Sequence, residues 1–248
     1  MAYDYIGLVN QINRRVNEVE LSTTNFATAK GFYAQAKDAV NSSIRYINQT
    51  EYNWPFNHVT QEDTLTAHVV RYGDPDDAKV LDVNTFRIKE DATLGNATRK
   101  LNILSYEEYL QQHVHHEYSV DNSTSGMPSF VFRTPSQEYG VIPPPDKAYT
   151  IVYEYYRIPV DLENHDDVPG IPERFAHVVV DGAMYYTYLF RGSSQEAIIS
   201  KEKFEEGIKN MRSLLINRYD YVRSTFIPNS ISSGRLGAAT GTPGAAFD

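Results

Sequence analysis

The chain carries helix-type apolar patterns at both ends and strand-type segments between them. Apolar side chains recur at steps of three and four in residues 4–20, 27–52, 172–192 and 193–222. This spacing places the apolar side chains on one face of each predicted helix. The connection at Arg191, Gly192 and Ser193 is short, so the last two helices are predicted to be antiparallel neighbours. Each end of the chain is therefore predicted to form a helical hairpin.

Residues 56–160 have a different pattern, with short segments rich in β-branched and aromatic residues separated by Gly, Pro, Asn and Asp. Such segments predict strands joined by turns. Ser105 and Glu108 form a capping-box pattern, which predicts one short helix that ends near His113. The predicted strands are residues 69–70, 80–88, 101–104, 130–132 and 149–156.

These patterns predict an α+β fold: an antiparallel four-helix bundle formed by the N- and C-terminal helical hairpins, with an inserted antiparallel β-rich domain and a flexible C-terminal tail. The predicted boundaries are 1–53 for the first hairpin, 54–168 for the β-rich domain, 169–223 for the second hairpin and 224–248 for the tail. The tail is predicted from its composition, which is rich in Gly and Ala and too poor in apolar area to fold alone.

The acidic excess of the chain is confined to its middle. Residues 54–168 contain nine basic and nineteen acidic side chains, whereas residues 1–53 are neutral and residues 169–248 carry one net positive charge. An acidic surface repels phosphate, so a nucleic-acid-binding face on this segment is not expected. A passage through which DNA slides without adhering remains compatible with this charge.

Catalytic patterns are missing from the sequence. The chain has no cysteine, which excludes disulfides and thiolate chemistry. The cluster of His113, His115, His116 and Glu117 could hold a divalent metal, but a solvated helix end is the favoured reading. The acidic run Asp161, Glu163, Asp166 and Asp167 lacks the Gly and Glu of a calcium loop and suits the start of a helix instead. No cofactor is predicted.

Two further functions stay open at this point. Paired carboxylates could serve a glycan hydrolase, although sequence spacing identifies no pair. The 19 tyrosines could line a receptor- or sugar-binding module, a protein interface or simply a Tyr-rich sheet. The chain has no apolar run long enough for a membrane helix and no secretory pattern at its start, so folding in a cytoplasm without a membrane partner is expected.

Several stretches of the sequence resemble the tail adaptor, or head–tail connector, family of tailed bacteriophages. The resemblance covers about residues 5–227. It is carried by residues 16–21 (VNEVEL), 53–57 (NWPFN), 130–135 (FVFRTP), 143–146 (PPPD), 153–157 (YEYYR), 171–175 (IPERF) and 214–223 (LLINRYDYVR).

The resemblance implies a structural virion protein and not an enzyme. In the context of a phage, the two alternatives become a virion-associated glycan hydrolase and a receptor- or sugar-binding tail module. Members commonly form a ring of twelve copies beneath the portal, line a DNA channel and contact tail proteins below, such as a nozzle, tail tube or tail fibre. The expected location is the head–tail junction of the virion, after assembly in the host cytoplasm. The C-terminal segment is expected to reach the portal, and its candidate portal-binding residues are Arg218, Arg223, Phe226, Ile227, Ile231, Arg235, Leu236 and Phe247.

Overall fold

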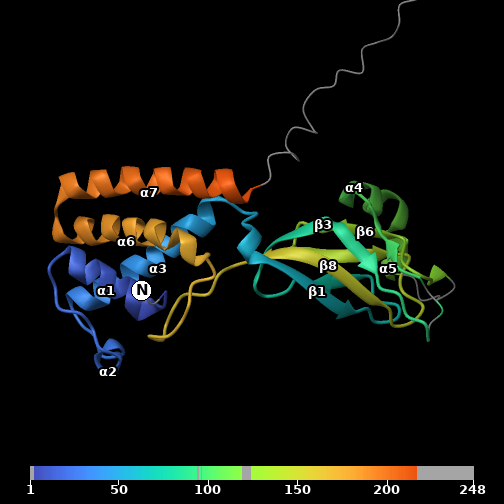
Figure 1. Cartoon of the computed structure of the whole chain (residues 1–248). Helices are drawn as coiled ribbons and strands as arrows, with labels where there is room; N and C mark the ends of the chain where they lie inside the picture. The colour runs from blue at the N-terminus through green and yellow to red at the C-terminus, as the bar shows by residue number, and fades with distance from the viewer. Residues whose placement is uncertain (1–2, 94, 96, 119–123, 217–248) are drawn as a thin grey trace, which may run out of the picture. The chain divides into compact units, whose positions relative to one another are not determined.

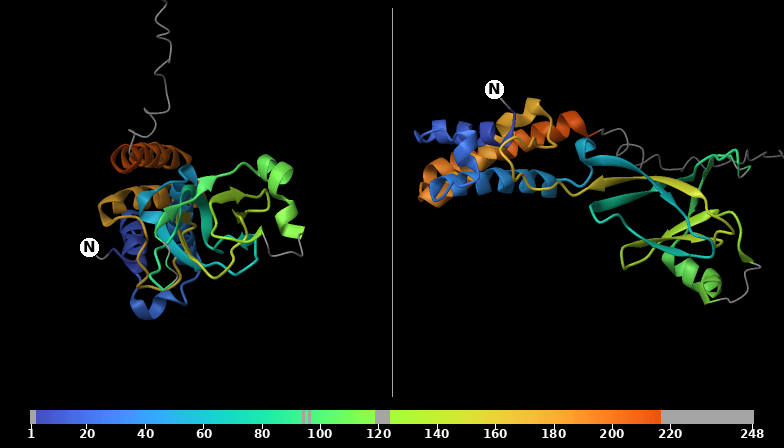
Figure 2. Two further views of the ribbon diagram at one scale, coloured as in Figure 1. Left: turned by 90° about the vertical axis from the view of Figure 1, so that its right-hand side faces the viewer. Right: turned by 90° about the horizontal axis from the view of Figure 1, so that it is seen from below.

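Four long helices form the helical part of the chain: α1 (Tyr5–Arg15), α3 (Phe32–Thr50), α6 (Ala176–Arg191) and α7 (Ser194–Leu215). The short helix α2 (Thr23–Phe26) lies in the connection between α1 and α3. These elements belong to a computed structural model that describes residues 3–93, 95, 97–118 and 124–216. Figures 1 and 2 show α6 lying between α7 on one side and the pair α1 and α3 on the other.

Helix α6 is the central helix of this group because it packs against α1, α3 and α7. The consecutive residues Val178, Val179 and Val180 are all buried, so at this level α6 has neighbours around much of its circumference. Gly182 allows a close approach: a Cβ atom placed there would lie 2.3 Å from the Ser43 hydroxyl oxygen of α3 and 2.6 Å from the Phe204 ring of α7. Three helices therefore converge on this one glycine.

The β region consists of two four-stranded sheets (Figure 1). The first has the order β1 (His58–Thr64), β8 (Thr150–Arg157), β3 (Ala78–Ile88) and β4 (Arg99–Lys100). The second has the order β2 (Arg71–Gly73), β7 (Glu138–Ile142), β6 (Phe130–Arg133) and β5 (Asn102–Ile103). All pairs are antiparallel except β5 with β6, which is parallel.

Aromatic side chains from both sheets share one buried core. Phe86 of β3 stacks on Tyr153 of β8 with ring centroids 4.6 Å apart, and Tyr139 of β7 meets the Phe86 ring edge-on at 5.2 Å. All three are at most 2% exposed. Stacked and edge-on geometries are favourable for aromatic rings, so this cluster joins the two sheets.

A helical segment connects β5 to β6 and covers the second sheet. It contains α4 (Tyr106–Glu108), the π-helix η2 (Tyr109–His113) and α5 (His115–Tyr118). The buried Tyr109 ring stacks on Phe132 of β6 at 3.9 Å. Parallel strands require such a crossover connection, which explains why β5 and β6 can run in the same direction. Two short 3₁₀ helices complete the described elements, η1 (Pro55–Asn57) and η4 (Glu173–Phe175).

The chain is α+β, but the predicted fold of an antiparallel four-helix bundle with an inserted antiparallel β-rich domain is wrong. The described residues form seven α-helices and two four-stranded sheets, one of which contains a parallel pair. The prediction failed because it gave each long helix a single apolar stripe, whereas α6 is buried around much of its circumference. The predicted tail, residues 224–248, lies outside the described residues, and the predicted four-part division stays a prediction.

Strand predictions succeeded for several apolar segments but missed both the polar strand β1 and the mostly buried strand β7. Strands β3, β6 and β8 lie at the predicted positions, but β1 and β7 were missed. The β1 sequence HVTQEDT contains a single aliphatic side chain, and every second residue is exposed because β1 is at the edge of its sheet. Edge strands commonly carry polar residues, which weakens their sequence signal.

The sequence contains two capping-box patterns, Ser105 with Glu108 and Ser193 with Glu196, and the predictions from them had different outcomes. Ser105 accepts a hydrogen bond from the Glu108 amide at 3.2 Å, which confirms the first N-cap. Ser193 makes no side-chain capping bond, so the second prediction is wrong. The preceding Gly192 has a left-handed φ of 76° and closes the end of α6. The α6–α7 connection therefore depends on a glycine C-cap and not on a serine N-cap.

We expect Gly182→Ala to lower the free energy of unfolding by about 1–3 kcal/mol, the usual cost of overpacking a core. This loss should occur although alanine is favoured over glycine within a helix by about 1 kcal/mol. Urea unfolding followed by circular dichroism measures the effect. Gly170→Ala is the control because a Cβ atom at Gly170 meets nothing within 4 Å. A Gly182→Ala variant more stable than the wild type would contradict the close approach of α3, α6 and α7.

Candidate functional site

An irregular segment, residues 158–171, connects β8 to η4 and runs along the start of α1 and the middle of α3. We call it the strap. It begins where the Ile158 amide donates to the Asp77 carbonyl at 2.7 Å, and near its end the Tyr3 hydroxyl donates to the Ile171 carbonyl at 2.7 Å. Between these points the strap is held by side chains and backbone groups of the two helices.

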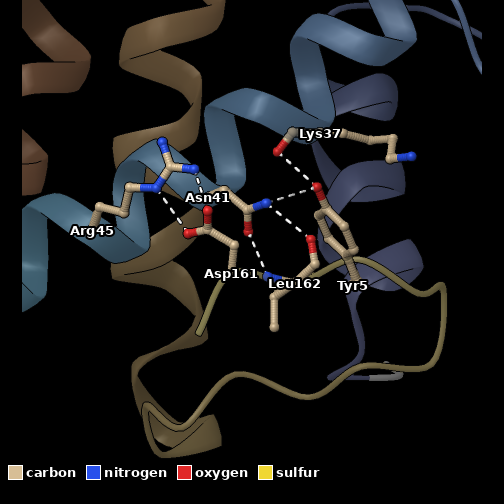
Figure 3. Close-up of polar contacts among 6 residues, drawn as sticks. All are labelled: Tyr5, Lys37, Asn41, Arg45, Asp161 and Leu162. Atoms are coloured by element: carbon tan, nitrogen blue, oxygen red, sulfur yellow. Dashed lines mark hydrogen bonds and ion pairs between the residues drawn. The ribbon is translucent and has the colours of Figure 1, made fainter. Parts of the chain in front are cut away.

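Asn41 of α3 forms the central attachment of the strap (Figure 3). Its side-chain amide donates to the Leu162 carbonyl at 2.9 Å, and its carbonyl oxygen accepts from the Leu162 amide at 3.1 Å. The same Asn41 amide lies 3.3 Å from the Tyr5 hydroxyl, which in turn donates to the Lys37 carbonyl. Asn41 and Leu162 are both buried, so one side chain satisfies two backbone groups that water cannot easily reach.

An ion pair lies beside this attachment. The Arg45 guanidinium forms a two-pronged contact with the Asp161 carboxylate, with Nε 2.8 Å from one oxygen and a terminal nitrogen on the other (Figure 3). The hydrogen bond from Arg45 lowers the pKa of Asp161 below its usual value. Burial, with the nearby Asp38 and Asp161 carboxylates, raises the pKa of Tyr5, so this hydroxyl stays protonated and can donate.

The acidic residues of the strap organise its own backbone and its contact with α1. One Asp167 oxygen accepts from the Glu163 and Asn164 amides, each at 2.7 Å, and these bonds lower the pKa of Asp167. The Asp167 carbonyl accepts from the Tyr5 amide at 2.8 Å. The acidic run was predicted to lie near a helix N-terminus, and the helix start that it adjoins is that of α1, whose Ile6 amide donates to the His165 carbonyl at 3.0 Å.

A pocket of about 230 Å³ lies between the strap, α3 and η1. Its apolar lining includes Ile44, Phe56, Leu162 and Ile171. Three strap side chains that line it are mostly exposed: Ile158 at 51%, Val160 at 83% and Val168 at 62%. The lining is therefore mostly apolar, but it also contains the polar side chains of Asn48, Asn57, Asp77 and Arg157.

The end of α3 is joined to the β region beside this pocket. Trp54 is fully buried, and its indole N–H donates to the Ile47 carbonyl at 2.8 Å. Lys79 of β3 donates to the Asn48 and Glu51 carbonyls at the end of α3. Burial lowers the pKa of Lys79. These bonds satisfy helix-terminal carbonyl groups, which explains why α3 ends where the chain enters the β region.

A second apolar surface lies at the turn between α6 and α7. Leu189 and Phe190 end α6 and are 50% and 55% exposed, while Ile198 and Ile199 near the start of α7 are 59% and 55% exposed. We call these four side chains the turn cluster. Arg191 connects the turn to the α1–α2 connection, because it contacts the Glu18 carboxylate at 2.5 Å. Exposed clusters of large apolar side chains commonly mark interaction sites.

The histidine cluster does not form a metal site in the described part of the chain. The His113 and His116 rings stack at 5.8 Å, and His115 lies 4.1 Å from His116, which together with burial lowers the pKa of His116. The Glu117 carboxylate forms an ion pair with Arg71 at 2.6 Å and accepts a hydrogen bond from the Tyr109 hydroxyl at 2.7 Å. Among the described residues, no group of three or more His, Cys, Asp or Glu side chains could hold a metal ion. The favoured alternative of a solvated helix end is wrong for Glu117, which is partly buried.

Comparison with known families identifies the chain. The model of the family described as SU10 adaptor protein matches residues 3–226, which includes all of the helices and strands described above. This chain belongs to that family. It is a family of phage head–tail adaptors, so the resemblance seen in the sequence is confirmed. In a comparison with curated protein sequences, nothing matches the chain.

Membership in the SU10 adaptor family makes the chain a virion component of a structural class. No helix in the described ranges of the adaptor is sufficiently long and apolar to span a bilayer. The candidate portal-binding residues cannot be placed, because they all lie outside the described residues. They are Arg218, Arg223, Phe226, Ile227, Ile231, Arg235, Leu236 and Phe247.

Sequence analysis of the adaptor missed the strap, the pocket and the turn cluster. Asn41 gave no signal, because an asparagine within a predicted helix looks like any other polar residue. Val160 and Val168 could have been noticed, since aliphatic side chains beside Pro159 and Pro169 in an acidic loop are unusual for a solvated connection. Leu189 was interpreted as part of the apolar stripe of its helix and not as an exposed residue, and Phe190 was not singled out.

We expect Asn41→Ala to lower the free energy of unfolding by about 2 kcal/mol or more, because it leaves the Leu162 amide and carbonyl unpaired in a buried site. Amide hydrogen exchange should become faster within the strap. Urea unfolding measures the free energy of unfolding, and mass spectrometry measures the rate of amide hydrogen exchange in the strap.

Arg45→Ala is the matched control, one turn away on α3. Its ion pair with Asp161 is about half exposed, so we expect a loss below about 1 kcal/mol. The lowered pKa of Asp161 means that this contribution is present above the ordinary Asp pKa of about 3.9 and is lost as the pH falls through the lower folded value. An equal loss from the two substitutions near neutral pH would contradict the central role of Asn41.

Proposed function

We propose that the chain is a head-to-tail adaptor subunit that forms a ring beneath the phage portal. In this proposal the ring contains twelve copies, joins the portal to the tail and lines part of the DNA channel. The observation that carries the proposal is the family match over residues 3–226. It places nearly the whole chain, and not one module of it, within a phage adaptor family.

The charge distribution supports a passive role toward DNA. The acidic excess lies in residues 54–168, which include both sheets. Within this region several carboxylates are already hydrogen-bonded by protein groups, such as Asp63 by Tyr153 at 2.6 Å and Asp77 by Tyr155 at 2.8 Å. A ring with this charge would repel phosphate and let DNA slide through without adhering.

Contact with the portal is assigned to residues 224–248 together with Arg218 and Arg223. The segment combines glycines with a few apolar side chains, and such segments suit a groove on a partner. The two arginines would pair with carboxylates of the portal, which orients docking more than it strengthens it. Tail proteins below the ring would contact other surfaces of the subunit.

Electron microscopy of the purified chain with and without its cognate portal tests the proposed ring. We expect closed rings of the chain on one end of the portal. Portal particles without added density at saturating chain concentration would contradict the proposed function.

We expect deletion of residues 224–248 to abolish portal binding while leaving the melting temperature nearly unchanged. The folded part should survive because residues Met1–Ile216 form a compact unit. Calorimetry and a portal pull-down measure the two properties. A length-matched control keeps the segment but replaces its apolar residues Phe226, Ile227, Ile231, Leu236 and Phe247 with serine. Unaltered binding by the deletion variant would show that another part of the chain docks on the portal.

We also propose that the adaptor performs no hydrolysis of cell-wall glycans. Glu117 and Asp63, two partly buried carboxylates of the β region, are engaged by arginine or tyrosine and so are not free to act as acid or base. Turnover of peptidoglycan by the purified chain that disappears on a single carboxylate substitution would contradict this proposal.

A further inference from the structure

Two apolar surfaces of this chain lie at opposite ends of α6. The turn cluster, Leu189, Phe190, Ile198 and Ile199, lies at the C-terminal end of α6 and the start of α7. The strap pocket lies at the other end, where Ile171 lines it just before η4 and α6 begin. A helix of 16 residues is about 24 Å long, so the turn cluster of one copy cannot reach the pocket of the same copy.

The two surfaces are complementary in form. One presents exposed apolar side chains around a turn, and the other is a pocket of about 230 Å³ whose lining is mostly apolar. That volume has room for an aromatic side chain such as Phe190. Val160, which is 83% exposed, stands at the rim where it would meet the neighbours of an inserted ring.

The two ends also differ in charge. Residues 157–171 contain one arginine and four carboxylates, and Arg45 of α3 pairs with Asp161, which leaves a net charge of −2. The end with the turn cluster, residues 14–31 and 189–201, contains five basic side chains and three carboxylates, and Asp181 pairs with Arg15, which leaves a net charge of +1. The two stretches at this end are tied together by the Arg191–Glu18 ion pair. Opposite net charges favour contact between unlike ends and disfavour contact between like ends.

We propose that the turn cluster of one copy of the chain inserts into the strap pocket of the next copy. The occupant of the pocket is therefore a second copy of this chain. Such a head-to-tail contact uses two different surfaces, so it propagates from copy to copy and forms a ring when the rotation closes. This inference rests on the proposed ring, and it names the surfaces that build it.

Cysteine cross-linking on the assembled protein tests the contact, because the natural chain contains no cysteine. The variants are Phe190→Cys, Val160→Cys and the double variant, each assembled on a portal whose own cysteines have been alkylated. Both positions are more than half exposed, so the substitutions should leave the fold intact. A short bismaleimide then links cysteines that lie close together, and denaturing electrophoresis displays the products.

The double variant should give a ladder of linked copies, and a mixture of the two single variants should give only linked pairs. Each single variant alone should give no linked product. The control replaces Leu110, which is 44% exposed and lies on η2 outside both surfaces, with cysteine and pairs it with Phe190→Cys. No link is expected in the control.

Three results would overturn the inference. If rings form on the portal but positions 190 and 160 are not linked, the two surfaces do not form the contact between copies. The proposed function would then still stand. A link between two copies of Phe190→Cys would mean that like ends meet. If the wild-type chain forms no ring on the portal at all, the proposed function fails and the inference fails with it.

Discussion

The close approach of three helices at Gly182 is the constraint on which the helical part depends. The missing side chain lets Ser43 of α3 and Phe204 of α7 reach the same point of α6. The Ser43 hydroxyl uses this proximity to donate to the Val179 carbonyl at 2.9 Å. Helices from the two ends of the chain therefore share one core, and the β region between them enters and leaves beside that core, at Trp54 and at the strap.

Several tyrosines fill the core of the sheets, which is one of the roles that composition left open. The rings of three tyrosines are buried, yet each hydroxyl donates a hydrogen bond to an aspartate at 2.6–2.8 Å. They are Tyr149, Tyr153 and Tyr155. Burial comes first among the causes that raise the pKa of these tyrosines, which keeps the donating proton in place. The excess of tyrosine and part of the excess of acid thus have one explanation, since the rings fill the sheets while the hydroxyls satisfy aspartates at the margins.

The sequence predicted those parts of the fold that depend on a strong local period. Helices α1, α3, α6 and α7 were found from their apolar spacing, and β3, β6 and β8 from their β-branched and aromatic residues. What it missed depends on distant partners. Strand β1 is recognisable only beside β8, the parallel pairing of β5 with β6 requires the crossover between them, and the importance of Asn41 appears only when Leu162, 121 residues later, lies next to it.

The strap contains both the groups that attach it to the helices and side chains that remain exposed to solvent. Its attachments use the backbone of Leu162, His165 and Asp167 and the carboxylates of Asp161 and Asp167. None of them uses the side chains of Val160 or Val168, which remain mostly exposed. Substitutions at these two positions therefore leave the attachments of the strap in place. Selection can therefore change the outer residues of the strap to suit a partner without loosening the helices that the strap holds.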